Sequence, residues 1–197
     1  MVFSNWVNVL MKDDVKKWIE EDGQKFLTEI GAKKGQFVLD FGCGVGHYTI
    51  PASKTVGRNG KVYALDKNKK TLDELERIIK EDSIKNIELI NKKLKIPLNK
   101  ASLDVVLCYD VIHYESKEQR KTIYSEVYRV LKNKGLFSVY PKHYKEDFPS
   151  NQLANMGLED IIEEVEQSGF VLGDKISKTL LHDEHYNKGY VLNFRRC

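Results

Sequence analysis

The stretch VLDFGCGVGHYTIP, from Val38 to Pro51, decides the fold that this sequence predicts. An apolar run ends at the acid Asp40, and glycines then follow at alternate positions, Gly42, Gly44 and Gly46. Glycine tolerates tight backbone conformations and lets the main chain come closer to a ligand than any side chain would permit. The stretch therefore predicts a strand, a tight turn that faces a ligand, and a helix that begins near His47.

Strand and helix patterns alternate outward from this stretch. Further strands are expected at 61–65, 87–90, 103–109, 136–140, 170–177 and 190–194, and amphipathic helices are expected over 13–30, around 72–80, and at 117–131 and 158–168. The two consecutive strand patterns at the end indicate an antiparallel edge. The predicted fold is an α/β, Rossmann-like, open seven-stranded sheet that is mostly parallel, with helices on both faces and an antiparallel last strand.

Length and composition set limits on this fold. A chain of 197 residues with 41% hydrophobic and 31% charged residues fits one soluble domain, 1–197, whose N-terminal helical segment 1–34 we expect to pack near the active site. The net charge of +3 is too balanced to argue for nucleic acid or membranes. No apolar run is long enough for a membrane span, and the 3 cysteines are widely spaced. We expect a cytoplasmic protein with reduced thiols and no metal.

Two acids define the chemistry of the expected ligand. In open parallel sheets, ligands bind beyond the carboxyl ends of the strands, so Asp40 and Asp66, after the first and second strands, should meet at one crevice. Asp66 is suited to accept hydrogen bonds from the hydroxyls of a ribose, as in NAD or S-adenosylmethionine (SAM). A dinucleotide fingerprint GxGxxG would need glycine in place of His47. Asp40 would repel a pyrophosphate but suits an ammonium or sulfonium group, which favours SAM.

These motifs resemble those of the class I SAM-dependent methyltransferases, of the small type found in ubiquinone and menaquinone methylation, and the resemblance covers almost the whole chain. It implies SAM as the cofactor and S-adenosylhomocysteine (SAH) as its product. The residues that it assigns to the cofactor are Asp40, Gly42, Gly44 and Gly46 at the methionine end, Asp66 at the ribose, Lys67 beside the adenine, the backbone amides of Lys93 and Leu94 at the adenine ring, and Tyr109 near the methionine end.

One position departs from the family pattern. The family commonly has an acid that contacts the adenine amino group, and Lys92 stands there in this chain. The side-chain oxygen of Asn91 is the alternative that the sequence offers. The exit of the fourth strand, DVVLCYDVIHY, matches the pattern well, and by resemblance Ile112 or His113 would lie under the adenine.

Methyl transfer from SAM requires few catalytic side chains. Methyl transfer from a sulfonium is an in-line displacement for which a protein mainly supplies alignment and exclusion of water. A hydroxyl acceptor would benefit from a base with a pKa near neutrality, and the candidates are His113 and His143, each after a strand. A packing role is an equal alternative for both. His182 and His185, in HDEH, are expected to be exposed in a connection between strands.

The expected acceptor is a small molecule. The strand exit CYDV is unlike the N/D-PPY of amino-methylating nucleic-acid enzymes, so nucleic acid is an unfavoured partner. Specificity should lie in the connection 141–157 and in residues 1–10. We expect no membrane insertion and a monomer or homodimer. The function predicted is methyl transfer from SAM to a small molecule; the alternatives are an NAD-dependent oxidoreductase and a non-catalytic SAM-fold binding or partner protein.

Overall fold

The computed structural model describes residues 12–197, and the N-terminal segment that was predicted to influence specificity, 1–10, lies outside this range. The described residues divide into two compact units, 12–91 with 180–187, and 92–179 with 188–197. We describe each unit by itself. Among the described residues, no helix combines the length and the apolar character that crossing a membrane requires.

Three parallel strands form the frame of the first unit. They are β1 (Phe37–Phe41), β2 (Lys61–Asp66) and β3 (Ile87–Asn91), in the order β3-β2-β1. Asp40 is aligned with Ala64, and Asp66 with Asn91. Val38, Leu39 and Phe41 of β1 and Val62, Ala64 and Leu65 of β2 are almost fully buried, as expected for parallel strands covered on both faces. The edge strand β3 is less buried. The register brings the carboxyl ends of the three strands to one edge.

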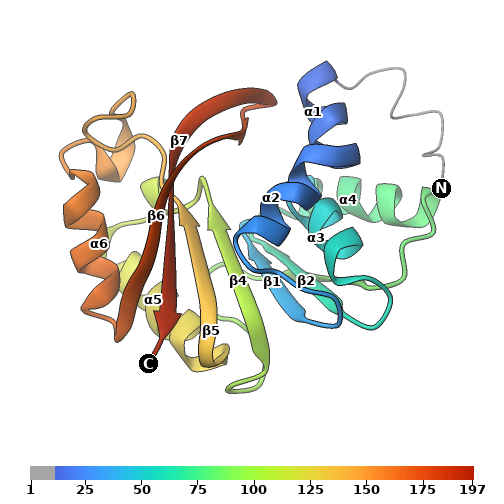
Figure 1. The fold of residues 1–197 in the computed structure, drawn as a ribbon, viewed down its shortest axis with the longest axis horizontal. Coiled ribbons are helices and arrows are strands. Elements are labelled where there is room, and N and C mark those ends of the chain that lie inside the picture. Colours follow the sequence, from blue (N-terminus) through green and yellow to red (C-terminus); the bar gives the residue numbers. More distant parts are fainter. Residues whose placement is uncertain (1–11) are drawn as a thin grey trace. The chain divides into compact units, whose positions relative to one another are not determined.

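The N-terminal helix of the first unit continues through a π-helical turn. The prediction of one helix over 13–30 corresponds to α1 (Asp13–Lys17), a π-helical segment η1 (Trp18–Asp22) and α2 (Gly23–Glu29), which follow one another without a break (Figure 1). A side chain at Gly23 would meet Pro51 of α3 (Thr49–Val56) at 2.7 Å. Glycine at this position therefore allows the two helices to pack closely.

The helix α4 (Lys69–Glu81) completes the first unit. The side chain of Asn68 caps it by accepting a hydrogen bond from the backbone N–H of Lys70 at 3.0 Å. Its buried residues are Leu72, Leu75 and Ile78, the apolar face that the sequence predicts.

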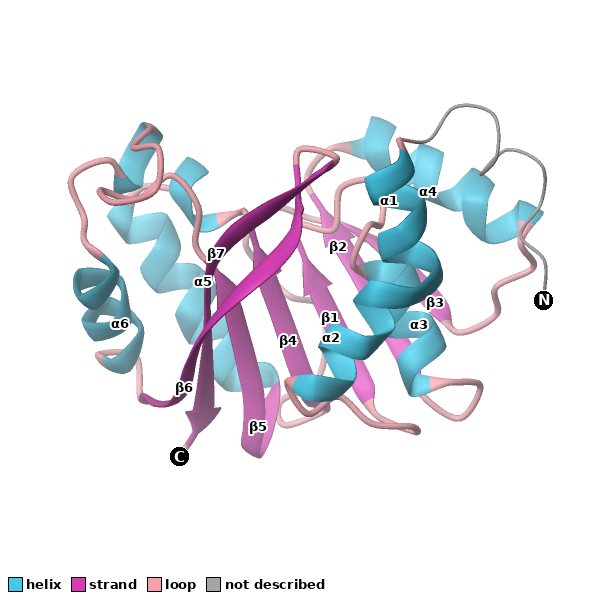
Figure 2. Cartoon of the chain, turned by 45° about the horizontal axis from the view of Figure 1, so that its top comes forward, coloured by secondary structure: helices cyan, strands magenta, loops and turns pink. Residues whose placement is uncertain are grey.

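Strands β6 (Phe170–His182) and β7 (His185–Arg196) are much longer than predicted and form a hairpin (Figure 2). Asp183 and Glu184 make the turn, with φ of 48° and 65°. A two-residue turn with both φ values positive matches the twist of the strands it joins, and Asp tolerates this conformation better than most residues. The connection predicted between 177 and 190 was therefore wrong: His182 and His185 are the strand ends.

The hairpin tip, residues 180–187, belongs to the first unit. The backbone N–H of Tyr186 donates to Asp14 at 3.0 Å, and its hydroxyl donates to Asp22 at 2.7 Å. The ring of Trp18 lies against that of Tyr186, with centroids 6.4 Å apart. Figure 1 shows the tip beside α1. These contacts explain why polar residues extend the strands beyond the point that hydrophobic alternation predicts.

Four strands form the sheet of the second unit, in the order β4-β5-β7-β6. The strand β4 (Leu103–Tyr109) has the predicted bounds and is parallel to β5 (Leu131–Tyr140), whereas β7 is antiparallel to β5. The strand β5 begins five residues before the predicted 136, with an irregular register at its start. Over the described residues the chain thus has seven strands, and the predicted α/β, mostly parallel sheet with an antiparallel last strand is confirmed.

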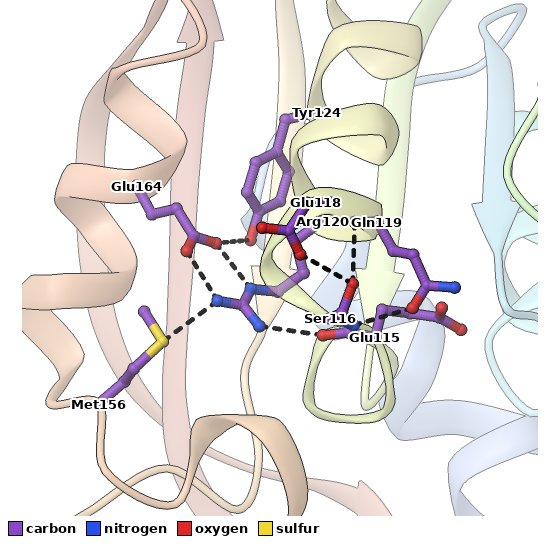
Figure 3. A network of polar contacts seen from close by, with 8 residues as sticks. All are labelled: Glu115, Ser116, Glu118, Gln119, Arg120, Tyr124, Met156 and Glu164. Atoms are coloured by element: carbon purple, nitrogen blue, oxygen red, sulfur yellow. Dashed lines mark hydrogen bonds and ion pairs between the residues drawn. The ribbon is translucent and has the colours of Figure 1, made fainter.

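Two helices, α5 (Lys117–Val130) and α6 (Leu158–Glu166), are joined by a buried ion pair in the second unit. Arg120 donates from Nε and Nη2 to the two carboxylate oxygens of Glu164, each at 2.7 Å. The same guanidinium donates to the Glu115 carbonyl at 2.9 Å and contacts the Met156 sulfur at 3.3 Å (Figure 3). The network therefore links both helices to Glu115, just before α5, and to Met156, just before α6.

Candidate cofactor and acceptor sites

The glycine turn of the first unit is folded onto the end of β2. The backbone N–H groups of Gly42 and Cys43 both donate to the Leu65 carbonyl, at 2.8 and 3.1 Å. All three glycines of the motif have positive φ: 77° at Gly42, 53° at Gly44 and 95° at Gly46. This is the left-handed region that favours glycine. The turn and the two strand ends therefore form one preorganised surface.

The side chain of Asp66 connects the glycine turn to the start of α4. One carboxylate oxygen accepts a hydrogen bond from the backbone N–H of Gly44 at 2.9 Å, and the other accepts one from Asn68 at 2.7 Å. These two bonds fix the plane of the carboxylate at the end of β2. Each oxygen keeps further acceptor capacity. The predicted ribose-binding acid is thus held in one orientation, beside the turn that the sequence predicts to contact the cofactor.

Asp40 is a buried acid with one hydroxyl partner. Its side chain is 3% exposed, and Oδ2 accepts a hydrogen bond from Thr49 Oγ1 at 2.6 Å. Burial raises the pKa of Asp40 to about 7, and the nearby charge of Asp66 adds to this rise, while the Thr49 bond opposes it. A cation bound nearby would favour the ionised form. Thr49 was not among the predicted site residues, because nothing in its spacing marks it as the partner of Asp40.

The space around the glycines differs from one to the next. A Cβ built at Gly44 meets nothing within 4 Å, so the backbone there borders open space. A Cβ at Gly46 would lie 2.5 Å from Leu75 Cδ1 in the core. Gly44 therefore fits a close approach of a ligand to the main chain, whereas Gly46 allows α4 to pack against the turn.

We expect Gly46→Ala to lower the free energy of unfolding by about 1–3 kcal/mol, because a positive φ is unfavourable for alanine and the methyl group would clash with Leu75. Gly35→Ala is the matched control: its φ is also positive, at 80°, but a Cβ there meets nothing within 4 Å. Urea unfolding of both variants gives the comparison. Equal losses would show that the contact with Leu75 contributes nothing.

Aromatic side chains of the first unit hold the residues that follow the turn. Trp18 Nε1 donates to the His47 carbonyl at 3.0 Å, and the Tyr48 hydroxyl donates to the Leu181 carbonyl at 2.8 Å. Burial lowers the pKa of His47. His47, which stands where a dinucleotide fingerprint has its third glycine, is therefore a packed residue two positions before α3.

The residues predicted beside the adenine lie at the end of β2 and after β3. Asn91 Nδ2 donates to the carbonyls of Asp66 and Lys67, at 3.0 and 3.2 Å, which leaves its Oδ1 as the group for the proposed contact. Lys67, Lys92 and Lys93 are exposed, and Leu94 is half-buried. The Lys93 ammonium lies 3.7 Å from Glu115 Oε2 within the second unit. The cofactor roles of Lys67, Lys93 and Leu94 stay predictions.

Tyr109 ends β4 in the second unit. Its ring is 5% exposed, and its hydroxyl is 2.7 Å from Ser138 Oγ, which donates to Asn193 at 2.7 Å. The hydroxyl is thus part of a buried polar chain across three strands. A contact between Tyr109 and the methionine end of the cofactor stays a prediction.

His113 and His143, which follow the paired strands β4 and β5, lie close together. Their ring centroids are 4.7 Å apart, at an interplanar angle of 62°. His113 is 1% exposed and lies in the short helix η2 (Ile112–Tyr114), whereas His143 is half-buried. His113 Nδ1 is 3.4 Å from Asp110 Oδ1. Asp110 is a residue that the sequence analysis missed, although its place directly after β4 was a usable signal.

The connection 141–157, where acceptor specificity is predicted, and the two histidines of the hairpin tip lie among the described residues. In the connection 141–157, the buried Lys142 ammonium is 2.8 Å from both carboxylate oxygens of Asp147, and Asp147 accepts the backbone N–H of His143 at 3.2 Å. In the hairpin tip, the His182 side chain is 8% exposed and that of His185 is 63% exposed. The expectation that both are exposed was therefore wrong for His182, whose strand position buries it.

Sequence comparison finds a family that matches about half of the chain. Residues 38–135 match the family described as a methyltransferase domain. The demethylmenaquinone methyltransferase of Lactococcus lactis is 34% identical over 114 residues, which are 56% of this chain and 44% of the relative. That of Lactobacillus johnsonii is 31% identical over 139 residues, 69% of this chain and 54% of the relative. The chain thus spans about half the length of these relatives.

Comparison with solved structures extends the likeness to nearly the whole chain. The crystal structure of a SAM-dependent methyltransferase from Aquifex aeolicus matches 98% of this chain and 98% of its own length, with a TM-score of 0.75 and 22% identity. At this identity the likeness concerns the fold.

Proposed function

Through residues 38–135 this chain belongs to the methyltransferase domain family, and on that premise we propose that it transfers a methyl group from SAM to a small-molecule acceptor. The resemblance to class I SAM-dependent methyltransferases that the motifs predict is thereby confirmed. The relatives named above are demethylmenaquinone methyltransferases, which supports a small organic acceptor.

The observation that carries this proposal is the coupling of the glycine turn to the strand-end acid. Asp66 binds the backbone of Gly44 at 2.9 Å, and the open space over Gly44 lies at the same turn as the buried Asp40. The two carboxylates fit SAM. Their negative charges favour its ammonium and sulfonium groups, and the carboxylate of Asp66 is suited to the hydroxyls of its ribose. Asp40, when ionised, would repel a pyrophosphate, which argues against the NAD alternative.

The residues of the first unit would act by binding and orientation. Asp40 would offset positive charge at the methionine end, Gly42 and Gly44 would let the ligand approach the backbone, and Asp66 would hold the ribose. Gly46, predicted as a cofactor residue, would act indirectly, because it lets α4 pack against the turn. When bound, SAM would supply an electrophilic methyl group, which passes in line to a nucleophilic atom of the acceptor as the carbon–sulfur bond breaks and SAH leaves. For a hydroxyl acceptor, a general base at His113 or His143 of the second unit stays a prediction.

Titration calorimetry with SAM and SAH tests cofactor binding, and turnover of methyl-labelled SAM with a library of quinols, phenols and carboxylates tests transfer. We expect saturable binding of both ligands and label transfer to at least one acceptor. Absence of SAM and SAH binding at millimolar ligand would refute the proposal. Binding with no transfer to any acceptor would instead support the non-catalytic alternative.

The affinity for SAM should rise with pH through about 7. The pKa of Asp40 is raised to about 7 by burial, so this carboxyl is protonated at pH 6 and ionised at pH 8, and only the ionised form attracts the cationic ligand. Binding near pH 6 should therefore release a proton from Asp40. Calorimetry in buffers of different ionisation enthalpy measures this release.

The amino group of SAM also titrates and could itself make binding depend on pH. Asp40→Asn is the control, because it removes only the titration of Asp40. The amide keeps an acceptor for Thr49 but does not titrate, so we expect weaker binding and a flatter pH dependence between pH 6 and 8. An unchanged pH profile in Asp40→Asn would assign the pH dependence to another group.

A further inference from the structure

We propose that Asp110, His113 and His143 form a binding site for a divalent transition-metal ion, with Zn²⁺ as the reference ion. The three residues offer one carboxylate oxygen and two imidazole nitrogens, and these atoms all lie within 4.8 Å of one another. Two histidines and one carboxylate are a common ligand set for catalytic zinc and for non-haem iron, and they leave coordination positions open. All three residues belong to the second unit.

The pairing of two strands sets the position of Asp110 and His143. Tyr109 and Tyr140 are aligned at the ends of β4 and β5, and the backbone N–H of Asp110 donates to the Tyr140 carbonyl at 3.0 Å. The residues that follow both strands therefore leave the sheet at one point. Asp110 and His143 both have left-handed backbones, with φ of 59° and 62°. Such conformations carry strain and are concentrated at functional sites.

The distance between Asp110 and His113 fits two ligands of one ion better than a hydrogen bond. Oδ1 and Nδ1 are 3.4 Å apart, whereas charge-assisted hydrogen bonds are about 2.7–2.9 Å long. Two ligands about 2.1 Å from one zinc ion, at the tetrahedral angle, are about 3.4 Å apart. This pair thus has the spacing of two neighbouring ligands.

His143 has its lone pair on the nitrogen that faces away from the backbone. Its Nδ1 is 3.1 Å from the Phe148 carbonyl oxygen. A carbonyl can only accept, so Nδ1 carries the hydrogen and the neutral ring keeps its lone pair on Nε2. A ligating histidine usually donates its other N–H to a carbonyl or carboxylate in this way. His113 is buried, and His143 is half-buried in the connection 141–157.

Nitrogen ligands select the class of ion. Imidazole suits Zn²⁺, Co²⁺, Ni²⁺ and Fe²⁺, whereas Mg²⁺ and Ca²⁺ prefer oxygen ligands alone. Water or an oxygen of the acceptor would complete the coordination sphere. The role of the acceptor oxygen rests on the proposed function, but ion binding does not. Coordination would also occupy the lone pairs that His113 or His143 would need to act as a general base. The metal-loaded protein could therefore not use these nitrogens as the base.

The test uses the full chain after dialysis against a chelator. Calorimetric titration with ZnCl₂ should give one ion per chain, and Co²⁺ should give the visible absorption of a four- or five-coordinate site. Asp110→Asn and His143→Asn should each weaken Zn²⁺ binding by about 10-fold or more. Asparagine tolerates the left-handed backbone at both positions, so these variants are expected to fold.

His185→Asn is the matched control, because His185 is an exposed histidine outside the cluster, in the hairpin tip. It should bind Zn²⁺ with unchanged affinity. Loss of binding in His185→Asn with retention in Asp110→Asn would move the site to the hairpin and overturn the proposal. So would failure of the parent chain to bind Zn²⁺ or Co²⁺. SAM titrations of the same samples separate the two proposals, since SAM binding without ion binding refutes only the metal site.

Discussion

Asp66→Ala should weaken SAM binding by about 100-fold. A hydrogen bond to a charged group is worth about 1.5–3 kcal/mol, so if Asp66 binds two ribose hydroxyls as proposed, its loss should cost about 3 kcal/mol or more. The substitution also removes the acceptor for the backbone N–H groups of Gly44 and Asn68. The glycine turn should therefore lose orientation together with the ribose contact.

Calorimetry with SAM and SAH measures this effect, with Asp73→Ala as the control. Asp73 is an exposed acid of α4 in the same unit, paired with Lys69 at 2.7 Å. The control removes the same charge at the surface and should leave the affinity nearly unchanged. Thermal unfolding of Asp66→Ala shows whether the protein is folded. A folded Asp66→Ala that binds SAM as well as the parent would refute the role of this acid.

Arg120→Met should lower the free energy of unfolding by about 3–5 kcal/mol. Arg120 and Glu164 have side chains that are 3% and 6% exposed, and removal of one partner leaves an uncompensated charge in the interior. The Glu115 carbonyl and the Met156 sulfur also lose their donor (Figure 3). Urea unfolding followed by circular dichroism gives the magnitude.

Two comparisons make this measurement specific. The double variant Arg120→Met with Glu164→Leu should recover much of the loss, because neither charge then remains buried. Lys175→Met breaks the exposed pair of Lys175 with Glu159, whose side chains are 39% and 76% exposed, and should lower the free energy of unfolding far less than Arg120→Met does. An equal cost for the buried and the exposed pair would contradict the role assigned to Arg120.

Local patterns predicted most of the fold. The strand β4 has the predicted bounds, and β2, β3, α5 and α6 differ from their predictions by one or two residues. These elements have strong apolar periodicity and clear ends. The helix of residues 13–29 was also predicted, but its π-helical turn was not, because nothing in the local sequence distinguishes it.

The hairpin shows where local patterns fail. Residues 178–189 are polar enough to indicate a connection, yet they form strands, and Asp183 and Glu184 alone make the turn. The polar strand ends are stabilised by distant groups, such as the carboxylates of Asp14 and Asp22 that bind Tyr186. Contacts between residues this far apart in the chain are decided by tertiary packing.

The sequence by itself determined the turn of Val38 to Pro51 and the acids that accompany it. Alternate glycines and a strand-end acid are local requirements of a backbone that must approach a ligand, so their spacing is readable in one chain. Only the tertiary structure decided which partners those residues have. Thr49 bonds to Asp40 and the Gly44 backbone bonds to Asp66, and Asp110 meets His113 and His143 because two parallel strands end side by side. Such encounters depend on strand register, which no single stretch of sequence encodes.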